Sequence, residues 1–180
     1  AEFGFFDDEQ IAVELKDVTD KILKAKDDPK ISGILLKLSF INASSTSVDE
    51  IRLALLEFKA SGKFVWNYSD YMTQKAFYLA SMADKIILAP EGELLFQGMS
   101  NEMIYLKGMF AKLDIEPTLI RAGDYKSAGE MLINDKMSDY ERQQTEAFLL
   151  PVYNRMINII AQSRNIDADK LHQIADSLLV

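Results

Sequence analysis

The chain has 180 residues, 48% of them hydrophobic, which is enough to bury one good core or a core with a helical appendage. Its net charge of -8 at pH 7 argues against nucleic acid or an anionic membrane surface as the main partner, because both favour a basic face. The absence of cysteine excludes disulfides, thiolate catalysis and cysteine-ligated metals.

The two ends of the chain predict a piece of a longer protein. Ala1-Glu2-Phe3 resembles a tag remnant, and we expect residues 1–10 to be this remnant or an irregular lead-in. The last residues, Ser177 to Val180, stop abruptly on apolar side chains. No apolar run reaches the length of a membrane span, and no basic segment followed by an apolar one opens the chain.

The first elements in chain order are a helix, a strand and a second helix. Apolar residues at helical spacing predict a helix over residues 11–27 that ends before Pro29. The nearly continuous apolar run Ile31–Leu38 predicts a strand buried on both faces. A capping box, Ser47-Val48-Asp49-Glu50, predicts a helix that runs to Ser61 and is closed by Gly62.

The alternation of strands and helices continues through the middle of the chain. The expected elements are a strand at 64–68, a helix at 74–82, strands at 85–89 and 94–96, a helix at 103–113 and a strand at 117–121. This order indicates an α/β fold with a parallel sheet and right-handed crossovers.

After residue 126 the pattern becomes wholly helical. A second capping box, Ser138 to Glu141, opens a long helix that we expect Pro151 to kink, and a final helix opens at Asp167. The long helix carries one apolar stripe, formed by Thr145, Phe148, Leu149, Val152, Met156, Ile159 and Ile160. The sequence therefore predicts one α/β domain over residues 11–137 and a helical extension over residues 138–180.

The hexamer Gly123-Asp124-Tyr125-Lys126-Ser127-Ala128 carries the most chemistry. It places Lys126 at a strand-to-helix turn, with Gly123 free to take unusual backbone angles. A loop lysine is ordinarily a solvated charge. It acts as a general base only when its amine is neutral, which requires a pKa lowered by roughly three units, or about 4 kcal/mol. Desolvation by Met131, Leu132 and Ile133 favours this, while Asp124 opposes it unless it points to the opposite face.

This hexamer closely resembles the segment that carries the catalytic lysine in bacterial signal peptide peptidases of the protease IV type, which are Ser/Lys-dyad serine endopeptidases. A second segment, Phe77 to Pro90, resembles the helix and strand that follow the nucleophile in the same family. In the catalytic copy of the family the preceding residues read Ala-Ser-Gly-Gly, whereas this chain has Thr73-Gln74-Lys75-Ala76. Gln74 stands at the serine position, and Ser39 to Ala43 stand where a Gly-Gly oxyanion loop is expected.

The long form of this peptidase joins two related α/β halves, and the chain resembles the N-terminal half, which supplies the lysine. The resemblance implies a ClpP/crotonase-like spiral of β-β-α units. It also implies that Lys126 is the general base for a serine from the C-terminal half of the same protein. The implied partners are that half, further copies of the chain, and signal peptides or other apolar peptides. The implied location is the bacterial cell envelope, at the inner membrane with the domain on the periplasmic face, and no cofactor or metal is implied.

Other candidate residues have simpler interpretations. Ser127, Ser69, Ser81, Ser44 and Ser45 are each interpreted as structural rather than nucleophilic. The acidic groups Asp7-Asp8-Glu9 and Asp27-Asp28 suggest metal binding, but they flank helix ends and are better explained as solvated caps. The single histidine, His172, lies in a helical pattern and is interpreted as a helix residue.

Two other functions remain open. A crotonase-type acyl-CoA enzyme shares the implied fold but needs a Gly-rich loop of N–H donors, and Asn42-Ala43 argues against it. A non-catalytic assembly domain is favoured by Gln74 and opposed by Lys126. The sequence on its own predicts that the isolated chain folds but cleaves no peptide.

Overall fold

The computed structural model describes residues 14–120, 122–123 and 125–177. The predicted lead-in, the acidic run Asp7 to Glu9, and the single positions Arg121 and Asp124 lie outside the described residues. The chain divides into two compact units, one ending at Phe96 and the other beginning at Gln97. The predicted domain limits at residues 11, 137 and 138 remain a prediction.

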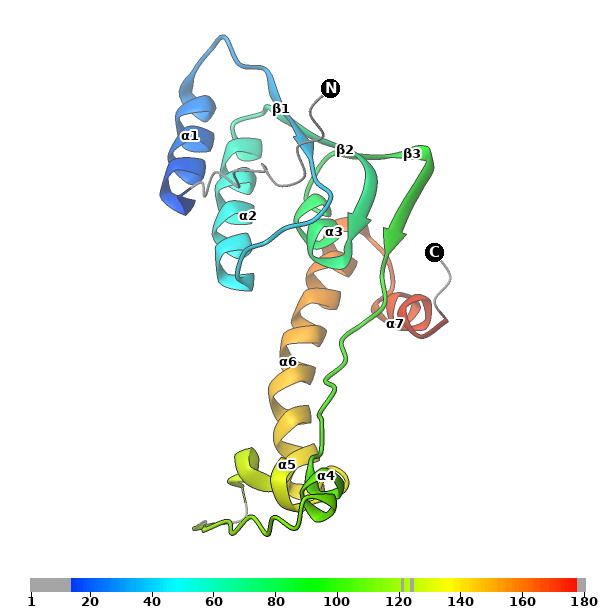
Figure 1. The fold of residues 1–180 in the computed structure, drawn as a ribbon. Helices are drawn as coiled ribbons and strands as arrows, with labels where there is room; N and C mark the ends of the chain where they lie inside the picture. The colour runs from blue at the N-terminus through cyan, green and yellow to red at the C-terminus, as the bar shows by residue number, and fades with distance from the viewer. Residues whose placement is uncertain (1–13, 121, 124, 178–180) are drawn as a thin grey trace, which may run out of the picture. The chain divides into compact units, whose positions relative to one another are not determined.

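The first unit is built on a sheet of three parallel strands in the order β1-β2-β3 (Figure 1). The strands are β1 (Gly33–Lys37), β2 (Phe64–Thr73) and β3 (Lys85–Leu95). β2 and β3 pair on both sides of a register shift between Ser69 and Tyr71, so the predicted strands at 85–89 and 94–96 are parts of one strand. The α/β class with a parallel sheet is therefore confirmed.

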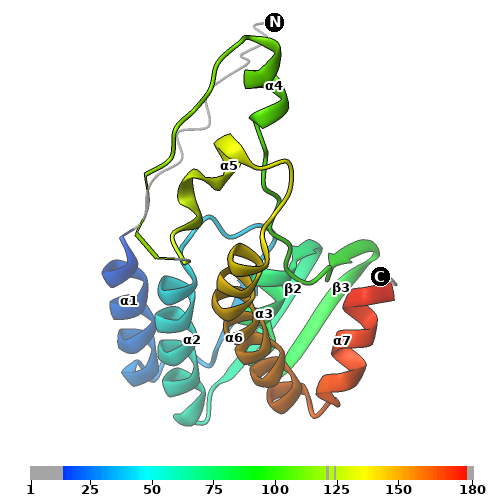
Figure 2. The same ribbon diagram turned by 90° about the horizontal axis from the view of Figure 1, so that it is seen from below.

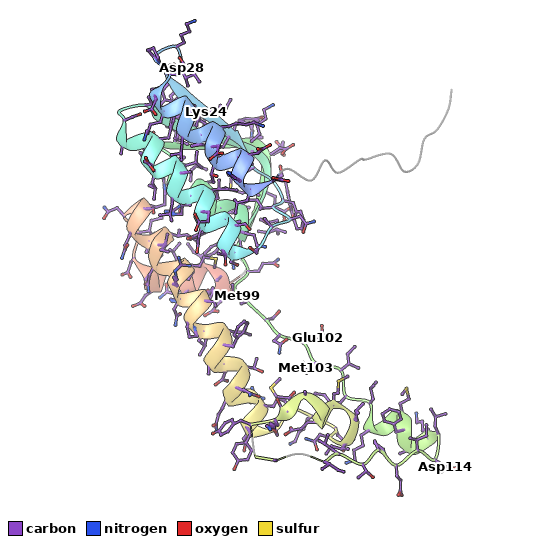
Figure 3. The ribbon with its side chains drawn as sticks, turned by 90° about the vertical axis from the view of Figure 1, so that its left-hand side faces the viewer. Lys24, Asp28, Met99, Glu102, Met103 and Asp114 are labelled. Carbon is purple, nitrogen blue, oxygen red and sulfur yellow. The ribbon has the colours of Figure 1, made fainter. Side chains whose placement is uncertain are left out.

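Three helices belong to this unit, and α1 (Leu15–Asp27) lies beside α2 (Ser45–Ala60) in both views (Figures 1 and 2). α1 ends before Pro29 as predicted, and Figure 3 labels Lys24 on this helix and Asp28 at its C-terminal end. α2 begins earlier than predicted. Its N-cap is Ser44, whose hydroxyl accepts a hydrogen bond from the Ser47 amide at 3.0 Å. The predicted cap at Ser47 was wrong because Ser44 supplies the same chemistry one turn earlier.

The core of the first unit lies between the sheet and its helices. Met72 of β2 is buried with Ala76 and Ala80 of α3 (Gln74–Ala80), and partly buried Leu38, Ile41, Phe77, Ile86 and Leu94 pack against them. Phe77 also meets Phe96 edge to face, with ring centroids 5.8 Å apart. Small residues on α3 let this short helix approach the sheet closely, which fixes the position of its first residue, Gln74.

The opposite face of the sheet is apolar and exposed. Leu35 is 58% exposed, and it pairs with Trp66, whose ring lies 4.9 Å from that of Phe64. Tyr68 and its partner Ile87 are 41% and 42% exposed on the same face. The prediction that the strand at 31–38 is buried on both faces was therefore wrong for the described residues. An apolar run indicates a surface suited to burial but does not say what covers it.

The second unit is helical over its regular part. Its elements are α4 (Lys107–Lys112), the 3-10 turn η1 (Ser127–Gly129), α5 (Glu130–Ile133), α6 (Asp139–Arg164) and α7 (Ala168–Ser177). The Ser138 hydroxyl accepts a hydrogen bond from the Glu141 amide at 3.1 Å, which confirms the second capping box. α6 ends at Asn165 in the left-handed conformation, and α7 then lies beside α6 (Figure 2).

Two predictions about this unit need correction. Residues 117–120 form no strand among the described residues, and Ile120 is 94% exposed, because no neighbouring strand offers a ladder of hydrogen bonds there. The apolar stripe on α6 is buried only toward its C-terminal end, at Ile160, whereas Phe148 is 73% exposed and Val152 is 40% exposed. α6 continues through Pro151, and the kink remains a prediction.

Candidate functional site

The segment around Lys126 is a tight connection between extended chain and helix. Gly123 has φ +92°, a left-handed value that L side chains rarely adopt, as the sequence predicted. Lys126 itself has φ -117° and ψ 68°, outside both the helical and the strand regions, and η1 begins at the next residue. The backbone therefore turns at the lysine, and α5 follows directly.

A close contact holds this turn against the preceding extended chain. A Cβ atom placed on Gly129 would lie 2.3 Å from Cδ1 of Leu119. The glycine thus lets Leu119 pack directly on the main chain of η1, three residues after Lys126. Sequence reasoning did not single out Gly129, although a glycine opening a helical pattern is itself a signal of close approach.

Side chains of α6 hold the residues on both sides of Lys126. The Tyr125 hydroxyl donates to Oε1 of Gln143 at 3.2 Å, and its ring meets that of Tyr140 edge to face at 5.3 Å. Nε2 of Gln144 donates to the Tyr125 carbonyl at 2.8 Å, while its Oε1 accepts from the Ser127 hydroxyl at 2.9 Å. Sequence reasoning missed these α6 residues. The available signal was that Tyr140 and Gln144 lie one helical turn apart, near the cap.

The lysine side chain is exposed in this chain. Leu132 and Ile133, which were expected to wall it, instead line a hollow of about 490 Å³. The rest of that lining is Lys107, Phe110, Ala111, Asp114, Ile115, Glu116 and Pro117, so Lys126 is not among the described residues that form it. Asp114, labelled in Figure 3, lies just after α4 in this part of the unit.

Two buried carboxylates lie on the helices that follow the lysine segment. The Tyr105 hydroxyl donates to Oε2 of Glu141 at 2.6 Å, and Glu141 is buried. Burial, then this hydrogen bond and the negative charges of Glu141 and Glu130, raise the pKa of Tyr105 to about 12. Glu130, the first residue of α5, is also buried and accepts from Nδ2 of Asn134 at 3.1 Å.

The position expected for the nucleophile lies in the first unit, at the start of α3. Gln74 is the first residue of this helix, directly after the N-cap Thr73. The residues on both sides of Gln74 bind the loop after β1. The Thr73 amide donates to the Ser39 carbonyl at 3.0 Å, and Nζ of Lys75 donates to the Ala43 carbonyl at 2.8 Å. The structure thus brings Gln74 and the 39–43 loop together, as the resemblance implied.

An arginine fixes the other end of α3. Arg52 is buried, and its Nη1 donates to the Tyr78 carbonyl at 2.8 Å and to the Ser81 hydroxyl at 3.0 Å. Burial lowers the pKa of Arg52, and the neighbouring Tyr78 and Asp49 counter this shift. A guanidinium at the C-terminal end of a helix is favourably placed against the helix dipole. α3 is therefore held at both ends.

The remaining candidate serines have structural partners. Ser69 donates to the Leu38 carbonyl and accepts from Nδ2 of Asn67 at 3.1 Å. Ser81 donates to the Tyr78 carbonyl at 2.8 Å, and Ser44 caps α2. Ser45 is the first residue of α2.

The histidine and the acidic pair also take structural positions. His172 lies on α7, with its ring 5.3 Å from that of Tyr153. Asp27 ends α1, and Asp28 caps that helix and accepts from the Lys30 amide at 2.8 Å.

The described part of the chain shows neither a cluster of metal ligands nor a membrane-spanning helix. No group of three or more His, Cys, Asp or Glu side chains there is arranged to hold a metal ion. Among the same residues, no helix combines the length and apolar character that crossing a membrane requires.

The family model "Peptidase family S49" matches residues 57–179 of the chain. This range includes the Gln74 segment, the Lys126 segment and the α6 residues that hold it. S49 is a family of ClpP/crotonase-like fold, which agrees with the α/β class seen here.

Curated proteins match over most of the chain. "Protease 4" of Haemophilus influenzae is 36% identical over 156 residues, which is 86% of this chain and 25% of that protein. "Protease 4" of Salmonella typhi is 33% identical over 178 residues, or 98% of this chain and 29% of that protein. "Serine protease SPPA, chloroplastic" of Arabidopsis thaliana is 29% identical over 83% of this chain and 22% of that protein. The chain spans less than a third of the length of these relatives, and it belongs to serine peptidase family S49, the family of protease IV and the signal peptide peptidases.

Proposed function

We propose that this chain supplies the general base of a Ser/Lys-dyad serine endopeptidase, and that this base is Lys126. The nucleophilic serine comes from a segment outside these 180 residues. One observation carries the proposal: a tethered segment presents Lys126 to solvent, while Gln74 takes the position expected for the serine. A carboxamide cannot act as the nucleophile, so a chain with a lysine alone needs a serine from elsewhere.

The proposed reaction is acyl transfer through a covalent intermediate. A neutral lysine amine takes the proton of the serine hydroxyl as the serine oxygen attacks the peptide carbonyl. The resulting ammonium then gives its proton to the leaving amine, and an ester of serine remains. Water hydrolyses that ester by the same proton transfers in reverse order. Lys126 is exposed in this chain. The segment that carries the serine would therefore also supply the desolvation that keeps the lysine amine neutral.

The proposed substrates are cleaved signal peptides and other extended apolar peptides. One relative carries the name "Putative signal peptide peptidase SppA", and the exposed apolar surfaces of this chain suit apolar partners. We place the assembled enzyme at the bacterial inner membrane, with this domain on the periplasmic side. The proposed partners are the half that carries the serine and further copies of the same chain.

A second candidate is a non-catalytic assembly domain, favoured by the chemistry beside Gln74. There the loop after β1 offers its Ala43 carbonyl to Lys75. An oxyanion hole requires N–H donors, and the same observation opposes a crotonase-type acyl-CoA enzyme.

The test uses the assembled, full-length peptidase with Lys126→Ala and Lys126→Arg. Both variants should lose turnover of an apolar fluorogenic peptide, because alanine has no base and a guanidinium stays protonated at any working pH. Thermal unfolding and oligomer size should stay as in the parent, since the side chain is exposed. Activity above background in either variant would show that Lys126 is not the base, and would leave the assembly domain as the function.

A further inference from the structure

One glutamine side chain spans Lys126. The carboxamide of Gln144 binds the residue before the lysine through Nε2, at 2.8 Å from the Tyr125 carbonyl. It binds the residue after the lysine through Oε1, at 2.9 Å from the Ser127 hydroxyl. One side chain thus binds the main chain before the lysine and the side-chain hydroxyl of the residue after it. The lysine side chain itself remains exposed.

Gln144 is supported by a rigid platform. It lies in the second turn of α6, a helix of 26 residues whose N-terminus is capped by Ser138. Tyr140, one turn earlier, packs its ring on Tyr125 at 5.3 Å, and Gln143 accepts from the Tyr125 hydroxyl at 3.2 Å. A helix holds side chains more precisely than a loop does. The contacts from α6 therefore restrict the positions that the lysine segment can take.

The lysine needs such support because its own backbone angles, φ -117° and ψ 68°, belong to neither a helix nor a strand. A general base must lie within about 3.2 Å of the proton that it abstracts. A displacement of about 1 Å is enough to cost roughly 100-fold in rate. The residues that fix positions 125 and 127 therefore control how often a lysine at 126 reaches a reacting hydroxyl.

We propose that Gln144 is the positioning residue for Lys126, and that it acts by holding the Tyr125 carbonyl and the Ser127 hydroxyl on the two sides of the lysine. This inference depends on the proposed function, in which Lys126 is the base. Gln144 touches neither substrate nor the reacting atoms in this role. Its loss should lower kcat and leave KM within about twofold, because the lysine then occupies the productive position less often.

The experiment compares Gln144→Ala with Gln162→Ala in the assembled peptidase. Gln162 is an exposed glutamine of the same helix, and its change is chemically identical. We expect kcat to fall about 10- to 100-fold in Gln144→Ala and to stay unchanged in Gln162→Ala. Gln144→Glu keeps the acceptor for Ser127 but places a carboxylate oxygen against the Tyr125 carbonyl, so it should not restore kcat.

A second measurement does not depend on activity. Hydrogen exchange at the amides of residues 125–129 should become faster in Gln144→Ala and not in Gln162→Ala. Ser127→Ala removes one of the two bonds and leaves Gln144 in place, so its effect on kcat should be smaller. In the double variant Ser127→Ala/Gln144→Ala, the loss of kcat, expressed as a free energy, should be smaller than the sum of the losses in the two single variants. If Gln144→Ala fails to fold, the kcat values of Ser127→Ala and Gln144→Glu decide the question, because neither variant contains that change.

The outcomes separate the two proposals. If Lys126→Ala is inactive and Gln144→Ala keeps full kcat, the positioning role is wrong while the base stands. A change confined to KM would likewise overturn the positioning role. If Lys126→Ala stays active, the proposed function fails, and faster exchange in Gln144→Ala then shows only a structural clamp.

Discussion

The ammonium of Lys75 donates a hydrogen bond to the main-chain oxygen of Ala43, 2.8 Å away. This contact ties the loop after β1 to the first turn of α3, directly beside Gln74. The loop presents a carbonyl oxygen at a place where a catalytic copy of this architecture needs N–H donors. A carbonyl oxygen is an acceptor, so this contact adds no N–H donor to an oxyanion hole beside Gln74.

We expect Gln74→Ser to leave this chain without peptidase activity. The new hydroxyl would stand at the start of α3, but the loop beside it has Ser39 to Ala43 in place of the Gly-Gly pair expected of an oxyanion loop. Hydrolysis of an apolar fluorogenic peptide by the purified chain measures this. Serine-inhibitor-sensitive turnover, in the variant or in the parent chain, would contradict it.

The sequence predicted the elements whose patterns are local. The Ser138 cap, the end of α1 before Pro29 and the parallel sheet all follow from short-range chemistry or from alternation of elements. The functional interpretation of the Lys126 segment and of the loop beside Gln74 was based on a family resemblance, not on periodicity. The structure confirmed the positive φ of Gly123.

Apart from the α2 cap, which lies at Ser44 rather than Ser47, the errors involve contacts between distant residues. The strand expected at 117–121 has a strand-like composition but no neighbouring strand among the described residues. The sequence could not predict that Leu35 and Phe148 are exposed, because an apolar residue type does not indicate which residues pack against it. The role of Gln144 depends on α6 meeting residues 125–127, a tertiary contact that no local pattern encodes.

Gly129→Ala should destabilise the second unit by about 1 kcal/mol, because the new Cβ would meet Cδ1 of Leu119 at 2.3 Å and force that side chain to move. Leu119→Ala should remove this penalty, so that the two changes are less than additive in chemical denaturation. Gly108→Ala is the matched control. Its Cβ would meet nothing within 4 Å in α4, and alanine there should stabilise by roughly 0.5–1 kcal/mol. Equal effects at the two glycines would contradict the contact with Leu119.

The first unit should lose stability in acid through Asp84. Burial raises the pKa of this carboxyl, but hydrogen bonds from Lys59 and from the Val65 amide, each at 2.8 Å, outweigh burial and lower it below 3.8. A lowered pKa in the folded state gives stability that is present above the unfolded value and is lost as the pH falls through the folded value. The free energy of unfolding, measured in urea, should therefore fall less steeply below about pH 4 in Asp84→Asn than in the parent chain.

Asp135→Asn is the comparison for this acid test. Asp135 pairs with Lys107 at 2.7 Å, but its side chain is 69% exposed. Exposed pairs contribute little to stability, so this variant should keep the acid slope of the parent. An unchanged slope in Asp84→Asn would show that Asp84 does not carry the effect.

The chain should self-associate through α6 as its concentration rises, despite the net charge of -8. Phe148 is 73% exposed on this helix, and Val152, one turn later on the same face, is 40% exposed, so this apolar face favours burial against a partner. Phe148→Asp should shift the association to higher concentration in light scattering. Phe40→Asp changes an equally exposed phenylalanine in the first unit and should have little effect. A strict monomer at high concentration, or equal effects of the two changes, would refute this role for α6.

The register of the sheet has a consequence for the order in which the first unit folds. Trp66 pairs with Lys85 across the short connection through α3, whereas Gly33 pairs with Phe64 across the longer one through α2. Closing a shorter loop costs less chain entropy, so β2, α3 and β3 should meet in the folding transition state before β1 joins them. Conservative truncations in β3 should then slow refolding, while those in β1 should mainly speed unfolding. On this view the segment that carries Gln74 forms the folding nucleus of its unit.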